Sequence, residues 1–232
     1  MNILITGASS GIGYETALRF AENAESTVFV IARRSEQLTK LASESTAGKI
    51  VPVNMDLGTY DYQVLGAALD KYKIKHLDCI IHNAGYLINK PFEDLTGDDW
   101  ETVYRANVIG PAQLTRFLLQ YTDGKTLTHI VTIGSIGGVR GSMKFSGLSA
   151  YSSSKGALAI LTECLAEELR KRNVRVNCLA LGSVQTEMLT KAFPGYVASM
   201  LPGPVSRLIY EFATTGWKYF NGKILEVSTT NP

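Results

Sequence analysis

The sequence predicts a doubly wound α/β fold, in which helices cover both faces of a mostly parallel, seven-stranded sheet. Short runs rich in Val, Ile and Leu alternate along the chain with longer segments of helical period. That alternation is typical of βαβ units around a sheet buried on both faces. No repeat or low-complexity linker interrupts it over 232 residues, so we expect a single domain spanning residues 1–232.

Seven apolar runs have the length and the β-branched composition of buried strands. Right-handed crossovers would bring their carboxyl ends to one edge of the sheet, where open α/β sheets bind ligands. Functional residues are therefore expected directly after the strands. The predicted strands are Ile3–Thr6, Val28–Ala32, Ile50–Asn54, Leu77–His82, Ile130–Gly134, Val174–Leu181 and Ile224–Val227.

Six segments show apolar positions at helical spacing. In one of them, Arg170, Lys171 and Arg172 place cations at the negative end of the helix, and Asn173 suits the left-handed turn that follows. Between the last helix and the strand before it, residues 187–205 are rich in Pro and Gly and are predicted to cover the ligand site. The predicted helices are Ile12–Ala24, Glu36–Glu44, Tyr62–Tyr72, Asp99–Tyr121, Ala150–Arg172 and Val205–Thr214.

The composition argues against several classes of protein. Hydrophobic residues make up 45% and charged residues 19% of the chain, which is ordinary for a folded globular protein. The net charge of +2 is spread without long runs of one sign, so no nucleic-acid partner is expected. No secretory signal precedes the first strand and no apolar run approaches twenty residues, so we expect a cytoplasmic protein with no membrane partner.

Cysteine and histidine are few and scattered. The three cysteines lack Cys-x-x-Cys spacing and are odd in number, which argues against a disulfide framework and a zinc site. No histidine has a second ligand three or four residues away. We therefore expect no metal, and interpret Cys79, Cys164 and Cys178 as packed thiols.

The first predicted strand runs directly into a glycine-rich turn that opens a helix. Glycine permits a tight turn and a close approach of the backbone to a phosphate, and the helix start offers unpaired N–H groups to an anion. The spacing is G-x-x-x-G-x-G rather than the general G-x-G-x-x-G fingerprint of the Rossmann fold. The candidate cofactor-binding residues of this turn are Gly7, Ser9, Ser10, Gly11, Ile12 and Gly13.

Further motifs follow in order along the chain. His82-Asn83-Ala84-Gly85 follows the fourth strand, Asn107 lies in a long helix, Ser135 follows the fifth strand, and Tyr151-x-x-x-Lys155 begins the next helix. With the glycine turn, this series resembles the short-chain dehydrogenase/reductase family from Asn2 to about Met188. The resemblance implies a Rossmann fold, hydride transfer with a nicotinamide cofactor, and interconversion of a carbonyl and an alcohol in a small-molecule substrate.

The chemistry of Tyr151 and Lys155 is also predicted from the residues themselves. They lie four residues apart and share one helical face. Lowering a tyrosine pKa from about 10 to about 7 takes roughly 4 kcal/mol. The Lys155 ammonium and the positive nicotinamide ring, close together in a partly dry cleft, can supply it. Tyr151 would exchange a proton with the substrate oxygen, and Ser135 would donate a hydrogen bond to it. By resemblance, Lys155 also holds the nicotinamide ribose, and Asn107 anchors a proton-relaying water.

The cofactor is predicted to be NADP(H). The end of the second strand, where a carboxylate would hold the ribose of NAD, is Ala32, and Arg33 and Arg34 follow it. Arg33, assisted by Ser9, is the stronger candidate for the 2′-phosphate. Arg34 is the second candidate for cofactor binding, with a solvated cation as its alternative interpretation. The resemblance adds further cofactor-binding residues: Asp56 and Leu57 at the adenine, Asn83, Ala84 and Gly85 along the fourth strand's end, and Val184 and Thr186 at the carboxamide.

Two alternatives remain open at this stage: an NAD-dependent alcohol dehydrogenase of the same family, and a silent NADP(H)-binding sensor. The substrate is not predicted, although the segment between Ser135 and Tyr151, with Arg140 and Lys144, would border its pocket. By resemblance, the helices Asp99–Tyr121 and Ala150–Arg172 would pair two copies into a homodimer. A tetramer is less expected, because the chain ends in Ser228-Thr229-Thr230-Asn231-Pro232 where relatives continue.

Overall fold

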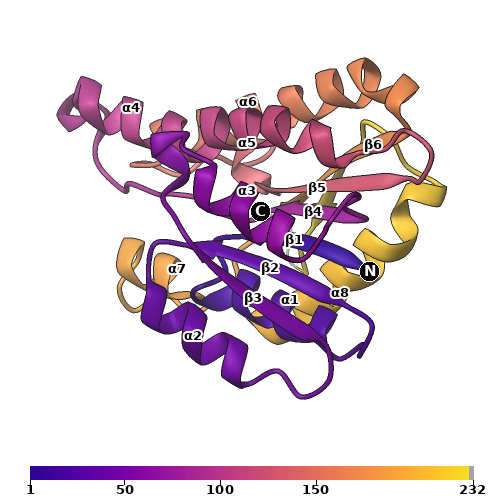
Figure 1. Cartoon of the computed structure of the whole chain (residues 1–232). Helices are drawn as coiled ribbons and strands as arrows, with labels where there is room; N and C mark the ends of the chain where they lie inside the picture. The colour runs from indigo at the N-terminus through magenta and orange to yellow at the C-terminus, as the bar shows by residue number, and fades with distance from the viewer. Residues whose placement is uncertain (230–232) are drawn as a thin grey trace.

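The computed structural model describes residues 1–229, in which seven parallel strands form one sheet in the order β3-β2-β1-β4-β5-β6-β7 (Figure 1). The predicted doubly wound fold is confirmed, and every strand pair in this part of the chain is parallel. Residues 230–232, on which the expectation about a tetramer partly rests, lie outside the described residues. The strands are β1 (Asn2–Thr6), β2 (Thr27–Ala32), β3 (Lys49–Asn54), β4 (Cys79–His82), β5 (Thr128–Ser135), β6 (Val174–Leu181) and β7 (Ile224–Val227).

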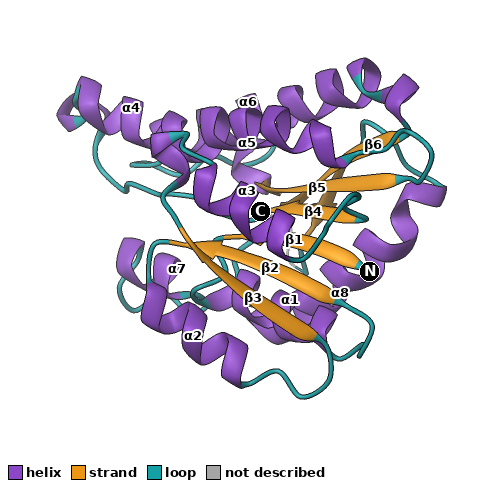
Figure 2. Ribbon diagram, in the orientation of Figure 1, coloured by secondary structure: helices purple, strands orange, loops and turns teal. Residues whose placement is uncertain are grey.

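Helices lie on both faces of the sheet, as Figure 2 shows. One apolar core joins the sheet to α1 (Gly11–Ala21), α2 (Ser35–Ser43) and α8 (Pro202–Thr215) through Phe20, Leu38 and Ile209. The other joins it to α3 (Gln63–Lys71), α5 (Gly110–Leu118) and α6 (Ser149–Glu168). The alternating side chains of each strand feed the two cores, as Ile3 and Leu4 do in β1. Both faces of the sheet are thus covered by apolar cores, and polar groups gather at the edges formed by the strand ends.

The predicted helix Asp99–Tyr121 is not continuous, and this prediction was wrong. The structure divides it into α4 (Gly97–Tyr104), a π-helical segment at Arg105–Ile109, and α5. Pro111 explains the division, because it has no N–H to bond the carbonyl of Asn107 four residues earlier, and the chain takes a wider turn there. Asn107 therefore lies in the π-helical turn, where its side chain does not point in the direction that a regular α-helix would give it.

Smaller differences occur around the predicted covering segment 187–205. A short helix, α7 (Glu187–Ala192), begins it, and Thr186 caps this helix by accepting a hydrogen bond from the backbone N–H of Leu189 at 3.3 Å. The last helix begins at Pro202 rather than Val205, because proline is well suited to the first turn of a helix. Asn173 has the expected left-handed conformation, with φ of 57°.

Candidate active site and cofactor pocket

The glycine turn after β1 is packed tightly against the end of β4. A Cβ atom on Gly7, whose φ is +69°, would lie 2.7 Å from Cα of Ala84, and one on Gly13 would lie 2.4 Å from Nδ2 of Asn83. The Asn83 amide in turn donates to the carbonyl oxygens of Thr6 and Gly7 at 3.0 and 3.1 Å. The glycines are therefore required for the approach of the two strand ends, whatever ligand the turn holds.

Thr6, the last residue of β1, was missed as a site residue by the sequence analysis. Its buried hydroxyl accepts hydrogen bonds from the backbone N–H groups of Asn83 at 3.1 Å and Ala84 at 2.9 Å. It thus fastens the Asn83-Ala84-Gly85 turn to the glycine turn. The signal for this role was present, since Thr6 is a polar residue at the end of an otherwise apolar strand.

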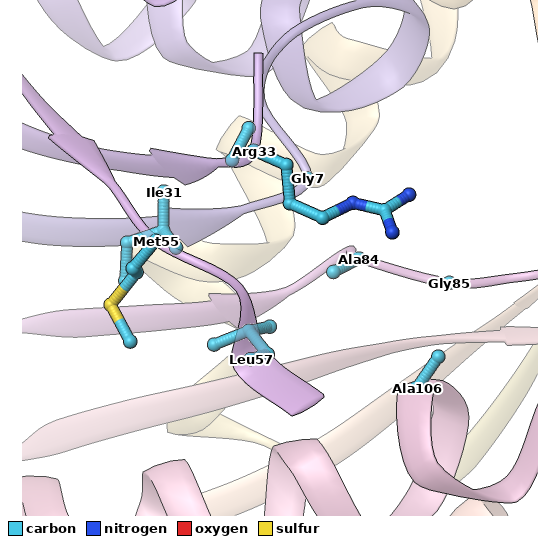
Figure 3. Close-up of a pocket in the computed structure, with 9 residues that line it drawn as sticks. Gly7, Ile31, Arg33, Met55, Leu57, Ala84, Gly85 and Ala106 are labelled. Atoms are coloured by element: carbon cyan, nitrogen blue, oxygen red, sulfur yellow. The ribbon is translucent and has the colours of Figure 1, made fainter. Parts of the chain in front are cut away.

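A cavity of about 140 Å³ opens beside this junction at the carboxyl edge of the sheet (Figure 3). Its walls are largely apolar and include Leu57, which was predicted to lie at the adenine, and Met55. Arg33 is its only charged lining residue within the described part of the chain. Figure 3 shows the Arg33 side chain extending over the same side of the cavity as Ala84 and Gly85. The remaining lining residues are Gly7, Ile31, Ala32 and Ala106.

These residues fit a dinucleotide. The start of α1 has no side-chain cap and no acidic residue in its first turn, so its N–H groups are available to a pyrophosphate. The apolar walls suit an adenine ring, and the cation suits a phosphate. Asp56, predicted to contact the adenine amine, accepts the Gly58 N–H at 2.8 Å and lies 3.8 Å from the Arg33 guanidinium.

The two arginines after β2 have different partners. Arg34, the second candidate for cofactor binding, donates to Ser9 Oγ at 3.2 Å and to Ser10 Oγ at 2.7 Å, and pairs with Glu187 at 3.0 Å. The Arg33 side chain is 71% exposed, and Asp56 is its only salt-bridge partner among the described residues.

The structure brings the predicted catalytic residues to the same edge of the sheet. Ser135 ends β5, and Tyr151 and Lys155 lie one turn apart near the start of α6, with the Lys155 ammonium 5.8 Å from the centre of the Tyr151 ring. Lys155 is 4% exposed and donates to the carbonyl of Ile133 at 2.8 Å. A lysine buried this deeply at a sheet edge is rarely a solvated surface charge.

Burial governs the protonation of this group. It raises the pKa of Tyr151, and a hydrogen bond with the Ser135 side chain opposes that rise in part. It lowers the pKa of Lys155 to about 8, because an ammonium is poorly solvated there. The lowering of the Tyr151 pKa was predicted with a bound nicotinamide ring as the second cation. In the chain alone, desolvation of the phenolate outweighs the Ser135 hydrogen bond.

Asn107 is fully buried, and both ends of its amide form hydrogen bonds with the protein. Its Oδ1 accepts from the N–H of Tyr86 at 2.7 Å, and its Nδ2 donates to the Tyr86 carbonyl at 2.9 Å and to Ser154 Oγ at 2.9 Å. Asn107 therefore holds the loop after Gly85 against α6. Tyr86 and Ser154 were not identified from sequence, because nothing in their local pattern indicates a partner so distant in the chain.

Gly138 sets the distance between the turn after Ser135 and α6. A Cβ atom there would lie 2.6 Å from the carbonyl carbon of Lys155 and 2.7 Å from the N atom of Gly156. Any larger residue would push these segments apart. Gly138 is thus a positioning residue for the pair formed by Ser135 and Lys155, and the sequence analysis did not identify it.

The loop after β6 completes the site from the other side. Thr186 lies against the glycine turn, since a Cβ on Gly11 would be 3.2 Å from its Cγ2. Val184 forms an isolated parallel bridge with Met200, and Gln185 Oε1 accepts from the N–H of Ala198 at 2.8 Å. Asn89 donates to the carbonyl of Ala192 at 2.8 Å, which joins the loop after Gly85 to α7.

A family model described as "short chain dehydrogenase" matches residues 1–196. The chain therefore belongs to the short-chain dehydrogenase/reductase family, as its sequence motifs predicted, and it is an oxidoreductase acting on a carbonyl/alcohol pair with a nicotinamide cofactor.

Named relatives have several activities. The chain is 31% identical over 192 residues to a 3-oxoacyl-[acyl-carrier-protein] reductase of Thermotoga maritima, covering 81% of this chain and 76% of that protein. It is 32% identical over 199 residues to an NADP-dependent 3-hydroxy acid dehydrogenase of Schizosaccharomyces pombe, covering 83% and 75%. A solved 3-ketoacyl-(acyl-carrier-protein) reductase of Brucella melitensis complexed with NADH superposes with a TM-score of 0.86 at 26% identity, covering 97% of this chain and 96% of that one.

Among residues 1–229, no helix has the length and apolar character needed to cross a membrane. Within the same residues, no cluster of three or more His, Cys, Asp or Glu side chains is arranged to hold a metal ion.

Proposed function

We propose that this protein is an NADP(H)-dependent carbonyl reductase or alcohol dehydrogenase in which Tyr151 is the general acid and base. The observation that carries the proposal is the convergence of Ser135, Tyr151 and Lys155 at the carboxyl edge of the sheet, beside the cofactor pocket. The bound nicotinamide supplies or accepts the hydride. Tyr151 moves the proton at the substrate oxygen, and Ser135 donates a hydrogen bond to that oxygen.

The protonation states suit proton donation to a carbonyl oxygen. Because burial raises the pKa of Tyr151, the phenol keeps its proton at neutral pH and is ready to donate it to a carbonyl oxygen. Lys155 lies next to the ring and, with a pKa of about 8, remains mostly charged at pH 7. A phenolate formed by proton donation is therefore stabilised by a buried ammonium nearby.

The preference for NADP(H) over NAD(H) is supported by the end of β2. Ala32 lines the pocket without a carboxylate that would repel a 2′-phosphate, and two guanidinium groups follow it. Arg33 reaches the cavity itself, and Arg34 lies at the serines of the glycine turn. Asp56, Leu57, Val184 and Thr186 complete the proposed cofactor site.

A homodimer is part of the proposal. Helices α4, α5 and α6 lie together on one side of the sheet in Figure 1. Ile109, in the π-helical segment between α4 and α5, and Ile160, in α6, expose 42% and 60% of their surface. Apolar side chains so exposed on adjacent helices suit a contact with a second copy. Light scattering after size exclusion would measure the mass of the particle, and a monomer would contradict this part.

The test of the function is a spectrophotometric assay of NADPH and NADH oxidation over a panel of ketones and aldehydes. Wild type should turn over with NADPH, and Tyr151→Phe should lose at least about 100-fold in kcat while still binding NADPH. If Tyr151→Phe retains wild-type turnover, the mechanism is wrong. If no compound reacts although NADPH binds tightly, the silent-sensor alternative gains.

A further inference from the structure

Arg34 is held by three groups, one at each nitrogen of its guanidinium. Nε donates to Ser9 Oγ at 3.2 Å, Nη2 donates to Ser10 Oγ at 2.7 Å, and Nη1 pairs with Glu187 Oε2 at 3.0 Å. The two serines belong to the glycine turn, whereas Glu187 lies 153 residues further along the chain. The ion pair thus joins the cofactor turn to the segment after β6.

Glu187 stands between two cations. It is the first residue of α7, and its other oxygen, Oε1, accepts from the Lys191 ammonium at 2.7 Å. These hydrogen bonds, first from Lys191 and then from Arg34, hold the pKa of Glu187 below its usual range, so it is charged at neutral pH. A full negative charge therefore lies against the guanidinium that faces the serines of the cofactor turn.

We propose that Glu187 is a specificity-determining residue that competes with the 2′-phosphate of NADP(H) for Arg34. The inference rests on the proposed cofactor assignment. A 2′-phosphate can be bound by Arg34 only if the guanidinium gives up at least part of its pair with Glu187, and the carboxylate also repels the phosphate. NAD(H) has a hydroxyl there and meets neither cost. Glu187 therefore narrows the preference for NADP(H) that the two arginines create.

The expected size of the effect follows from the exposure of the pair. The side chains of Arg34 and Glu187 expose 49% and 43% of their surface, so solvent screens the interaction. Pairs of this kind correspond to roughly twofold to fivefold in an equilibrium constant. Removing the Glu187 charge should tighten NADPH binding by about that factor and leave NADH binding unchanged.

The experiment measures dissociation constants of NADPH and NADH by nicotinamide fluorescence for wild type, Glu187→Gln, Lys191→Gln, Arg33→Ala and Arg34→Ala. Lys191→Gln is the matched control, because it removes the other partner of Glu187 from the same helix but keeps the carboxylate. It should leave NADPH binding unchanged or weaken it, and it should not tighten it as Glu187→Gln does. In a double variant with Arg34→Ala, the effect of Glu187→Gln should shrink, because its partner is gone. Thermal unfolding would verify that each variant is folded.

The outcomes separate this inference from the proposed function. Selective tightening of NADPH by Glu187→Gln supports the inference. If Glu187→Gln changes neither cofactor or both equally, while Arg34→Ala weakens NADPH alone, the inference fails and the NADP(H) assignment stands. The same holds if only Arg33→Ala weakens NADPH. If neither arginine variant changes the ratio of the two constants, the NADP(H) assignment itself fails.

Discussion

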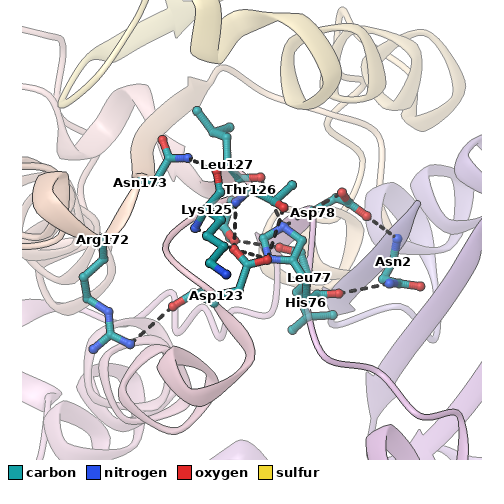
Figure 4. Close-up of polar contacts among 12 residues, drawn as sticks. Asn2, His76, Leu77, Asp78, Asp123, Lys125, Thr126, Leu127, Arg172 and Asn173 are labelled. Atoms are coloured by element: carbon teal, nitrogen blue, oxygen red, sulfur yellow. Dashed lines mark hydrogen bonds and ion pairs between the residues drawn. The ribbon is translucent and has the colours of Figure 1, made fainter.

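The polar groups at the two edges of the sheet formed by the strand ends, the amino edge and the carboxyl edge, are bonded differently. At the amino edge, shown in Figure 4, loops from four parts of the chain satisfy one another: the N–H of Asn2 donates to Asp78 at 2.6 Å, its amide donates to the carbonyl of His76 at 3.0 Å, and Asp123 accepts from the N–H groups of Lys125 and Thr126. Asn173 joins the same network by donating to the Lys125 carbonyl at 3.0 Å.

At the carboxyl edge, the polar groups face a cavity or hold charged side chains under burial. The start of α1 has no side-chain cap, Arg33 has one loose partner, and Lys155 carries its ammonium in a buried position. One edge is therefore organised for stability and the other for chemistry, since buried charges and unpaired polar groups cost stability and persist where they serve a function.

The largest expected effect that would test this division is at Lys155. Lys155→Met keeps the length of the side chain and removes its charge, so kcat/KM should fall by about 10²- to 10⁴-fold. Because burial lowers the pKa of Lys155, its charged form costs stability, and the melting temperature should stay the same or rise. Lys171→Met, at an exposed position just beyond the same helix, should change neither.

The next largest effect is a loss of stability at low pH, to which a buried histidine at each edge should contribute. Burial lowers the pKa of His82, near the carboxyl edge, and of His129, near the amino edge, to about 4. The unfolded chain binds these protons near pH 6.5, so the free energy of unfolding should fall as the pH drops from about 6.5 to about 4, by up to about 3 kcal/mol per residue.

Urea unfolding at pH 7 and pH 4.5 measures this loss. His129→Gln should remove part of the difference between the two pH values, and His82→Gln should remove another part, although each substitution also disturbs a hydrogen bond at pH 7. If both variants lose as much stability as wild type between the two pH values, other groups carry the pH dependence.

Gly138→Ala should reduce both stability and activity, because this glycine lies at the carboxyl edge and also sets the packing of the turn after Ser135 against α6. The added Cβ would force the turn after Ser135 away from Lys155 and Gly156, at a cost of about 1–3 kcal/mol. The same displacement should lower kcat by about 10- to 100-fold. Chemical denaturation and the assay would be run in parallel with Gly97→Ala, where a Cβ meets no atom within 4 Å.

The smallest effect is at the amino edge. Thr128 is fully buried, and its hydroxyl donates to the Leu77 carbonyl at 2.7 Å. Thr128→Val keeps the shape and removes the hydrogen bond, so the free energy of unfolding should fall by about 1 kcal/mol. Activity should be unchanged in the steady-state assay, and a substantial loss of kcat would argue that the two edges are coupled.

Much of the fold was predictable because its signals are local. Each strand is a largely apolar run, and the order of motifs indicated that Gly7 and Ser135 lie at strand ends and that Tyr151 begins a helix. The division of the long helix at Arg105–Ile109 was missed, although Pro111 signalled it, because apolar periodicity continues across the π-helical segment.

The finer contacts of the site depend on distant partners and were not predictable. Arg34 finds Glu187 and Asn107 finds Tyr86 only after the sheet brings separate loops together. The protonation of Tyr151 depends on how deeply the folded chain buries it, which no spacing in the sequence reveals. Local patterns thus located the site residues, while tertiary packing decided their partners.

The strand order has a consequence for synthesis on the ribosome. After β1, β2 and β3 have paired, each later strand adds beside the one made just before it or, for β4, beside β1, so the sheet grows at a single edge in the order of translation. Synthesis runs from the N-terminus, so the strands leave the ribosome in the order β1 to β7. A nascent chain can therefore extend this sheet strand by strand without opening any pair already formed. The opposite edge strand, β3, receives no further partner in this sheet. It contains Pro52, which has no N–H to donate to another strand.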